Sequence, residues 1–188
     1  MPAFLKKYPE IRLQLMVSNR RVDVINEGID IALRVRSKLD DDPSLVLRQF
    51  ALIEQSLFAS QAYLNEFGDI KNPEQLSEHR ILSLSEEHLD QQFLLHGPDN
   101  QQKKIKVSPI VMGTNIHMLA QLASQNCGIA LLPESAAEDF LKSGQLVQIL
   151  PEWKAPHGIL HAVYPSRRGL LPAVRVFIDY LVEHLSEH

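Results

Sequence analysis

Residues 114–133 read TNIHMLAQLASQNCGIALLP, a stretch that predicts an amphipathic helix followed directly by a short strand. The apolar side chains of the helix share one face, at Ile116, Leu119, Ala120, Ala123 and Cys127. Gly128 ends the helix, and residues 129–132 form the apolar run that is typical of a buried strand. Helices packed against buried strands are the units from which α/β folds are built.

The start of this helix, Gly113-Thr114-Asn115, carries no recognisable catalytic set. The first amide N–H groups of a helix have no partner inside it, and together with the helix dipole they favour carboxylates and other anions. The side chains of Thr114 and Asn115 add hydrogen-bonding groups. The same residues also fit a plain Thr cap without a ligand, and taken alone they favour that interpretation.

Working outward, strands and helices alternate along the chain. Residues 11–17 alternate apolar and polar side chains, which predicts a strand, and residues 21–27 predict a short helix that ends at Gly28. Residues 29–35 predict a second strand, so the three segments together predict a βαβ unit with parallel pairing.

The rest of the chain continues this alternation. An extended segment is expected at 46–59, a helix start at 72–74 and a hairpin turn at 97–100. Further strands are expected at 79–84, 105–111, 146–150 and 159–164, and further helices at 133–143 and from Pro172 to the end. The class is therefore α/β, and the polar middle with a late return of strand and helix indicates two lobes.

Composition restricts the function. The chain has 188 residues, a net charge of -4 and 1 Cys, so it cannot form an internal disulfide, and we expect a reducing, cytoplasmic setting. The acidic balance disfavours a bare nucleic-acid binder, because phosphate contacts need a basic face. No apolar run suits a membrane helix, and no signal peptide is recognisable at the start.

The motifs of common catalytic and metal sites do not occur. None of the 8 His residues stands at zinc-ligand spacing, and no nucleophile elbow or Gly-rich phosphate loop is present. We predict no catalytic residues, no metal and no cofactor. Cys127 is interpreted as a small core residue, Trp153 as a packing anchor, and residues 40–42 as a solvated acidic loop.

Five stretches, in order along almost the whole chain, resemble the effector-binding domain of LysR-type transcriptional regulators. They are FLKKYPEIRLQL at 4–15, RRVDVINEGIDIALRV at 20–35, LFASQAYL at 57–64, GIALLP with GQLVQILPEW at 128–153, and VYPSRRGLLPAVRVFIDYLVEHL at 163–185.

The resemblance implies a type-2 periplasmic-binding-protein fold, in which two Rossmann-like lobes are joined by two crossovers. Lobe I is expected at 1–58 with 165–188, and lobe II at 59–164. The implied effector-binding positions follow strand ends and helix starts; they are Ser18, Asn19, Val35, Arg36, Ser60, Thr114, Asn115, Ile116, Leu132 and Pro133. The helix start at 114–116 would then hold a ligand and catalyse nothing.

The sequence departs from the family pattern at its start. The family's DNA-binding winged helix-turn-helix and the first strand of lobe I do not occur in it. That strand would lie between the strands expected at 11–17 and 29–35. We therefore expect a substitute: either these two strands close up, or another chain fills the gap, since buried unpaired backbone groups are costly.

The leading hypothesis is a non-enzymatic sensor that binds a small-molecule effector, such as an organic acid or an aromatic carboxylate. The resemblance also implies a homodimer through lobe I, with residues 21–27 and 172–186 in contact, and binding to DNA only through a separate N-terminal domain. A free-standing solute-binding protein on the same fold and an enzyme remain as alternatives. No membrane partner is expected.

Overall fold

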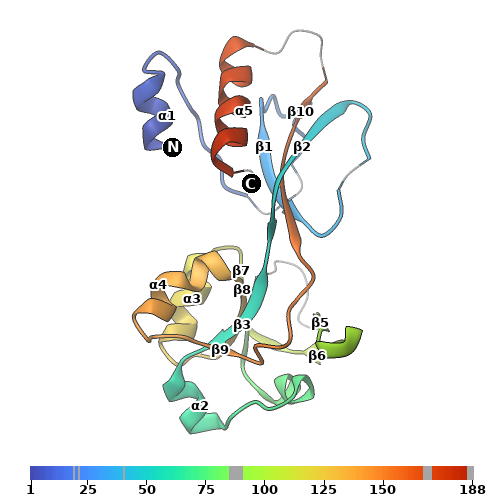
Figure 1. The fold of residues 1–188 in the computed structure, drawn as a ribbon, viewed down its shortest axis with the longest axis vertical. Helices are drawn as coiled ribbons and strands as arrows, with labels where there is room; N and C mark the ends of the chain where they lie inside the picture. The colour runs from blue at the N-terminus through green and yellow to red at the C-terminus, as the bar shows by residue number, and fades with distance from the viewer. Residues whose placement is uncertain (19, 21, 40, 85–90, 167–170, 186–188) are drawn as a thin grey trace. The chain divides into compact units, whose positions relative to one another are not determined.

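The computed structural model describes residues 1–188 apart from 19, 21, 40, 85–90, 167–170 and 186–188 (Figure 1). The chain forms two compact units: unit 1 comprises Met1–Leu52 and Gly158–His188, and unit 2 comprises Ile53–His157. The chain passes between them twice. At each crossing between the units, the boundary expected from the sequence lies a few residues later than the observed one. Residues 55–59 already pair within unit 2, and Ile159 already pairs within unit 1.

Unit 1 is a sheet in the order β1-β10-β2 with the helices α1 and α5. The bounds are α1 Pro2–Lys7, β1 Ala32–Arg36, β2 Leu45–Ile53, β10 Gly158–Pro165 and α5 Pro172–Leu185. The apolar stripe of α5 contributes Val174, Phe177, Ile178 and Leu181 to a core completed by Phe50, Ala162, Tyr164 and Phe4. The Phe4 and Phe177 rings meet edge to face at 4.9 Å between centroids, so this core holds α1 against α5.

The βαβ unit predicted at 11–35 is wrong. Residues 11–18 belong to no strand, and Leu15, Met16 and Val17 are 69%, 59% and 99% exposed. β1 begins only at Ala32 and runs antiparallel to β10. The alternation at 11–17 is real, but a strand exists only where a partner pairs with it. The expected closing of 11–17 onto 29–35 therefore does not occur, and filling of the gap by another chain stays a prediction.

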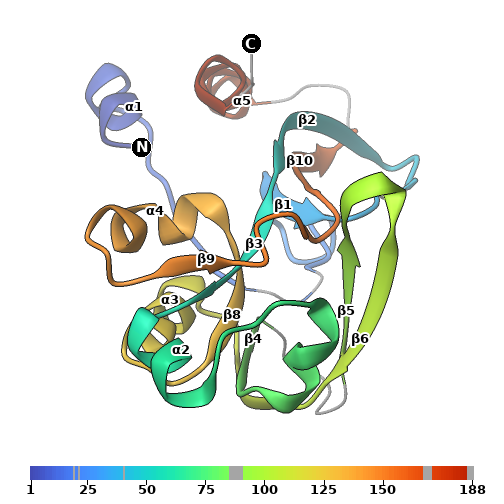
Figure 2. The same ribbon diagram turned by 60° about the horizontal axis from the view of Figure 1, so that its bottom comes forward.

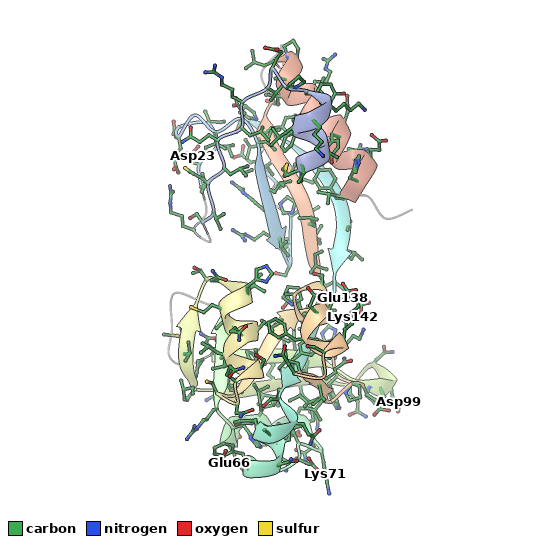
Figure 3. The ribbon with its side chains drawn as sticks, turned by 90° about the vertical axis from the view of Figure 1, so that its left-hand side faces the viewer. Asp23, Glu66, Lys71, Asp99, Glu138 and Lys142 are labelled. Atoms are coloured by element: carbon green, nitrogen blue, oxygen red, sulfur yellow. The ribbon has the colours of Figure 1, made fainter. Side chains whose placement is uncertain are left out.

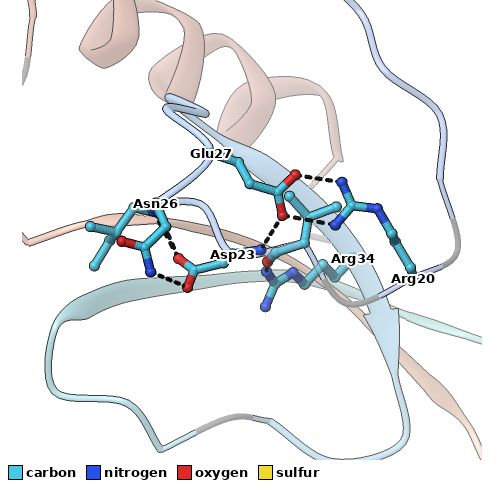
Figure 4. Close-up of polar contacts among 7 residues, drawn as sticks. Arg20, Asp23, Asn26, Glu27 and Arg34 are labelled. Carbon is cyan, nitrogen blue, oxygen red and sulfur yellow. Dashed lines mark hydrogen bonds and ion pairs between the residues drawn. The ribbon is translucent and has the colours of Figure 1, made fainter.

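The short helix predicted at 21–27 is instead a single tight turn (Figure 4). The Asp23 carboxylate accepts hydrogen bonds from the N–H groups of Ile25 and Asn26, at 3.1 and 3.0 Å. Glu27 accepts from the Asp23 N–H at 3.0 Å and pairs with Arg20, and these contacts hold the pKa of Glu27 down to about 2. Gly28, at φ 67°, ends the turn before a second one can form.

Unit 2 is a sheet in the order β7-β4-β8-β3-β9, in which β4 runs parallel to β7 and β8 while β3 runs antiparallel to β8 and β9. The strand bounds are β3 Gln55–Ala59, β4 Ile81–Leu84, β7 Pro109–Gly113, β8 Ile129–Pro133 and β9 Val147–Ile149. The remaining elements are α2 Gln61–Phe67, η1 Pro73–Glu78, β5 Gln91–His96, η2 Pro98–Asn100, β6 Gln102–Val107, α3 Ile116–Ser124 and α4 Glu134–Lys142.

Alternate side chains of the central strands enter cores on opposite faces of this sheet. The backbone elements that cover the two faces are drawn in Figure 2. Leu57, Ile81 and Ile129 enter one core, with α2, η1, Trp153 and the β5–β6 hairpin. Their neighbours Phe58, Leu82 and Ala130 enter a second core beneath α3 and α4. The sequence of each of these strands is therefore a continuous apolar run, as is usual for strands that are buried on both faces.

Several smaller predictions in unit 2 are confirmed. The predicted helix forms α3, although it ends at Ser124 and not at Gly128, and the predicted strand forms β8. Residues 97–101 connect β5 to β6. Trp153 is 9% exposed and packs against Gly97, where an added Cβ would lie 2.7 Å from the indole ring. Gly128 is required by a close approach, since a Cβ there would stand 2.4 Å from the Arg80 carbonyl oxygen.

The described residues include no helix that is both long and apolar enough to cross a membrane.

Tyr63 and His79 form a partly buried polar contact in unit 2. The fully buried Tyr63 Oη accepts the Arg80 N–H at 3.0 Å and lies 3.2 Å from His79 Nδ1. In the tautomer of the neutral imidazole that leaves Nδ1 unprotonated, the Tyr63 hydroxyl donates to Nδ1. Burial lowers the pKa of His79 below its ordinary value of 6.5 and raises the pKa of Tyr63.

The lowered pKa of His79 predicts that unit 2 loses stability in mild acid. The unfolded chain takes up a proton near pH 6.5 that the folded site rejects, so the stability present above that pH is lost as the pH falls through it. Urea unfolding followed by the fluorescence of the single Trp153, between about pH 8 and about pH 5, measures this loss. His79→Gln keeps an acceptor for Tyr63 but cannot titrate, so its pH dependence should be shallower. The exposed His117→Gln is the control, and equal slopes in the two variants would contradict the assignment.

Candidate functional site

The parallel strands of unit 2 end at one edge of its sheet, and five of the predicted residues meet there. The register pairs Leu84 with Gly113 across β4 and β7, and Leu82 with Ala130 across β4 and β8. The ends of β7 and β8 are therefore level. This edge carries Thr114, Asn115 and Ile116 after β7, and Leu132 and Pro133 at the end of β8. Ligands of open α/β sheets bind at such carboxyl ends.

The cap of α3 is Asn115 and not Thr114, which corrects the plain Thr cap considered from the sequence. The Asn115 side chain accepts the Met118 N–H at 3.0 Å, and its carbonyl accepts the Leu119 N–H at 3.1 Å. Both Thr114 and Asn115 are exposed, whereas Ile116 is half-buried. The cap thus fixes the backbone of the helix start while the Thr114 side chain remains in contact with solvent.

A buried polar group at the same edge was not found from the sequence. Ser83, 4% exposed near the end of β4, donates its hydroxyl to Gln91 Oε1, and Gln91 Nε2 donates to Met112 Sδ at 3.6 Å. The signal was a single Ser inside the apolar strand ILSL, because a polar residue buried in such a strand needs a hydrogen-bond partner.

The structure does not bring Ser60 to this edge. β3 runs antiparallel to β8, with Phe58 opposite Ala130, so the end of β3 lies beside the start of β8. Ser60 is 3% exposed and caps α2, accepting the Tyr63 N–H at 3.1 Å and donating to Asn126 Oδ1 at 2.7 Å. At the other end of β3, the fully buried Ser56 stands opposite Leu132 and donates to Glu134 Oε1 at 2.7 Å.

Four predicted residues belong to unit 1. Val35 and Arg36 are the last residues of β1, where Arg36 stands opposite Ile159 at the start of β10. Both side chains are exposed, and Arg36 Nη1 donates to the Val35 carbonyl at 2.9 Å. Ser18 is exposed in the irregular segment before the turn, and Asn19 lies outside the described residues.

Unit 1 also contains a buried histidine, His161, which was not predicted from the sequence. His161 lies on β10 opposite Arg34, and its Nδ1 stands 2.8 Å from the Ile159 carbonyl, which requires a proton on Nδ1. In the described part of the chain, Nε2 is buried without a hydrogen-bond partner. Arg34 donates to the Val22 carbonyl at 2.6 Å, which ties the turn at 22–28 to the sheet (Figure 4).

Metal-ligating side chains do not gather within the described ranges, where no group of three or more His, Cys, Asp or Glu could hold an ion. In the acidic loop at 40–42, Asp40 lies outside the described residues, and the Asp42 carboxylate accepts from the Ser44 N–H at 2.9 Å. This carboxylate stabilises a local turn. What the candidate site offers is hydroxyl and amide groups at sheet edges and a helix start, which suit the holding of a small polar molecule.

The chain forms two units that are joined by two connecting segments, and each unit carries polar groups at the carboxyl ends of strands. These features define the class of two-lobed ligand-binding domains. Within this class, the family model described as the LysR substrate binding domain matches residues 1–186, and the chain belongs to that family, with its periplasmic-binding-protein-like fold.

Relatives agree with this assignment. An HTH-type transcriptional regulator of Xanthomonas campestris is 29% identical over 186 residues, which cover 97% of this chain and 54% of that protein. The chain thus spans about half of that relative. The regulatory domain of CrgA from Neisseria meningitidis has a TM-score of 0.82 at 30% identity, covering 98% of this chain and 89% of that one. Full-length AphB, a virulence activator of Vibrio cholerae, has a TM-score of 0.83 at 26% identity, covering 98% and 62%.

The cap predicts how the helix start responds to substitution. Asn115→Ala should lower the free energy of unfolding by about 1 kcal/mol, because the Met118 N–H loses its acceptor. Asn115→Asp, which keeps an acceptor and adds a charge that the dipole favours, should retain it. Trp153 fluorescence during urea unfolding measures both. Gln121→Ala, at an exposed position of the same helix, is the control, and a loss there as large as in Asn115→Ala would show that the cap is misassigned.

Proposed function

We propose that this domain senses a small organic acid or aromatic carboxylate, and that the acid is held between two lobes formed by units 1 and 2. The observation that carries the proposal is the edge of the unit 2 sheet, where the capped start of α3, the Thr114 hydroxyl and the end of β8 meet. The positive end of the helix dipole and the exposed hydroxyl favour a carboxylate. Val35 and Arg36 at the end of β1 would supply the contacts from unit 1, with Arg36 as the cation.

The effector would act by shifting a conformational equilibrium. A ligand changes the arrangement of two lobes only if it binds one arrangement more tightly than the other. In the full-length regulator such a shift would be passed to DNA-binding domains in the cytoplasm. Chemistry on the ligand is not part of this role, and the relatives are named as transcriptional regulators. Those names favour a regulator over a free-standing solute-binding protein of a transport system, the alternative left open by the sequence.

Isothermal titration calorimetry tests the effector class. The full-length protein containing this domain is titrated with a panel of aliphatic and aromatic carboxylates and with their neutral amides. We expect at least one acid to bind and its amide to bind more weakly. Thr114→Val should weaken binding of the acid roughly tenfold, since a hydrogen bond to a charged group contributes about 1.5–3 kcal/mol.

The matched control is Gln61→Ala, an exposed polar residue on α2 at the opposite end of the sheet, and it should leave the affinity unchanged. The absence of binding to every carboxylate, together with binding of a cation, would contradict the proposed effector class.

A homodimer through unit 1 is the second part of the proposal. The elements expected from the sequence were residues 21–27 and 172–186. The apolar stripe of α5 is buried within unit 1, where Val174, Phe177 and Leu181 are 9%, 9% and 4% exposed. A partner would therefore meet the polar face of α5, which includes Arg175 and Asp179.

Size-exclusion chromatography with light scattering tests this contact. The domain should be dimeric at high concentration, and Arg175→Glu should raise the dissociation constant about tenfold by placing a like charge against the partner's acidic groups. Lys142→Glu on α4 of unit 2 is the control. A monomer at every concentration would rule the contact out for this domain.

A further inference from the structure

Both passages of the chain between the units leave unit 2 at the same place, and Lys154 lies where they meet. The first passage runs from β2 through Glu54 into β3, and the second runs from β9 through Lys154 to β10. The Ala155 N–H donates to the Gln55 carbonyl at 3.3 Å, so the two passages are hydrogen-bonded to each other. These contacts all lie within unit 2.

The Lys154 side chain joins this crossing to the end of β8. Its Nζ pairs with the Glu54 carboxylate on the first passage and lies 3.3 Å from Glu134 Oε1, at the start of α4. The Glu134 N–H donates to the Glu54 carbonyl at 3.1 Å, and the Glu134 carboxylate accepts from Ser56. The Lys154 ammonium group thus bridges two carboxylates. The Glu134 carboxylate is also hydrogen-bonded to Ser56 on β3, and Glu54 directly precedes β3.

The main chain of Lys154 is fixed from a further direction. Its N–H donates to the His96 carbonyl at 2.9 Å, and its carbonyl accepts the His96 N–H at 2.8 Å, which anchors it to the end of β5. The hydrogen bond between the two side chains lowers the pKa of Glu54 and raises the pKa of Lys154, so each group stabilises the charged form of the other. The Lys154 ammonium group therefore extends to the two carboxylates from a main chain that is itself held by hydrogen bonds.

The geometry points to a latch: the bridge from Lys154 to Glu54 and Glu134 holds both connecting segments in one conformation and so restricts the movement of the two units. Glu134 directly follows Pro133 of the candidate site, so a molecule bound at that edge would act on one end of the same bridge. The side chains of Lys154, Glu54 and Glu134 are 40%, 44% and 42% exposed, so the bridge can open without unfolding a core. This role rests on the proposed function in one respect, the movement of two lobes, and its test needs no effector.

Hydrogen exchange tests whether the bridge holds the crossing. In the full-length protein without added ligand, Lys154→Met should speed exchange of the Glu134 and Ala155 amides roughly two- to tenfold, since two partly exposed ion pairs are lost together. Lys154→Arg should restore the slow exchange. Lys142→Met is the matched control, because it removes the exposed pair between Glu138 and Lys142 within α4 (Figure 3). It should leave the Glu134 and Ala155 amides unchanged.

Single-molecule energy transfer tests the effect on the units. Dyes at Gln61→Cys on α2 and Lys6→Cys on α1, both exposed and both outside the proposed dimer contact, report the distance between units in a Cys127→Ala background. We expect Lys154→Met to broaden or shift the distribution of transfer efficiencies and Lys142→Met to leave it unchanged. Faster exchange with an unchanged distribution would overturn the latch, as would no effect on either measurement. An effector panel that fails to bind would contradict the proposed effector and leave this result standing.

Discussion

The structure of unit 2 depends on one constraint: its central strands must bury both of their faces. Leu57 and Phe58, Ile81 and Leu82, and Ile129 and Ala130 are adjacent in sequence and enter opposite cores. A strand buried on both sides cannot lie at a surface, so each parallel strand is followed by a segment that covers one face. The segments that follow β7 and β8 therefore lie at one edge. The candidate site is a consequence of this packing, because the exposed Thr114 and Asn115 follow β7 at that edge, where the packed sheet ends.

Local sequence patterns predicted the helices and strands whose formation depends on nearby residues. The stretch 114–133 carries its own helix face and strand, and the structure forms α3 and β8 from it. The alternation at 11–17 is as regular, yet the segment forms no strand, since pairing depends on a partner that a local pattern does not specify. For the turn at 22–28, the apolar residues suggested a helix, but the Asp23 and Glu27 side chains close one turn and Gly28 ends it. Side-chain hydrogen bonds decided between helix and turn there.

The candidate site was predictable in part for the same reason. Thr114 follows β7 and Leu132 lies near the end of β8, and both strands run parallel to β4, so the direction of the chain alone brings these residues to one edge. Ser60 follows β3, which runs against them, and is carried to the other edge, where both roles of its hydroxyl are filled within unit 2. Strand direction is a property of the whole sheet, and the segment around Ser60 does not encode it. Ser56 and Ser83 were missed because a lone Ser in an apolar strand indicates a buried hydrogen bond without naming its partner.

A sheet packed on both faces has little freedom to deform, because close-packed cores resist small displacements. A molecule at the carboxyl edge of unit 2 can therefore alter the backbone only where the packing ends, at strand ends and in the segments that leave the unit. β8 ends at Pro133, and the next residue, Glu134, donates its N–H to the Glu54 carbonyl in the passage toward β3. The half-exposed bridge to Lys154 lies at this junction, between a rigid core and chain that leaves it. Polar contacts of this kind are weak enough to exchange, which the proposed latch requires.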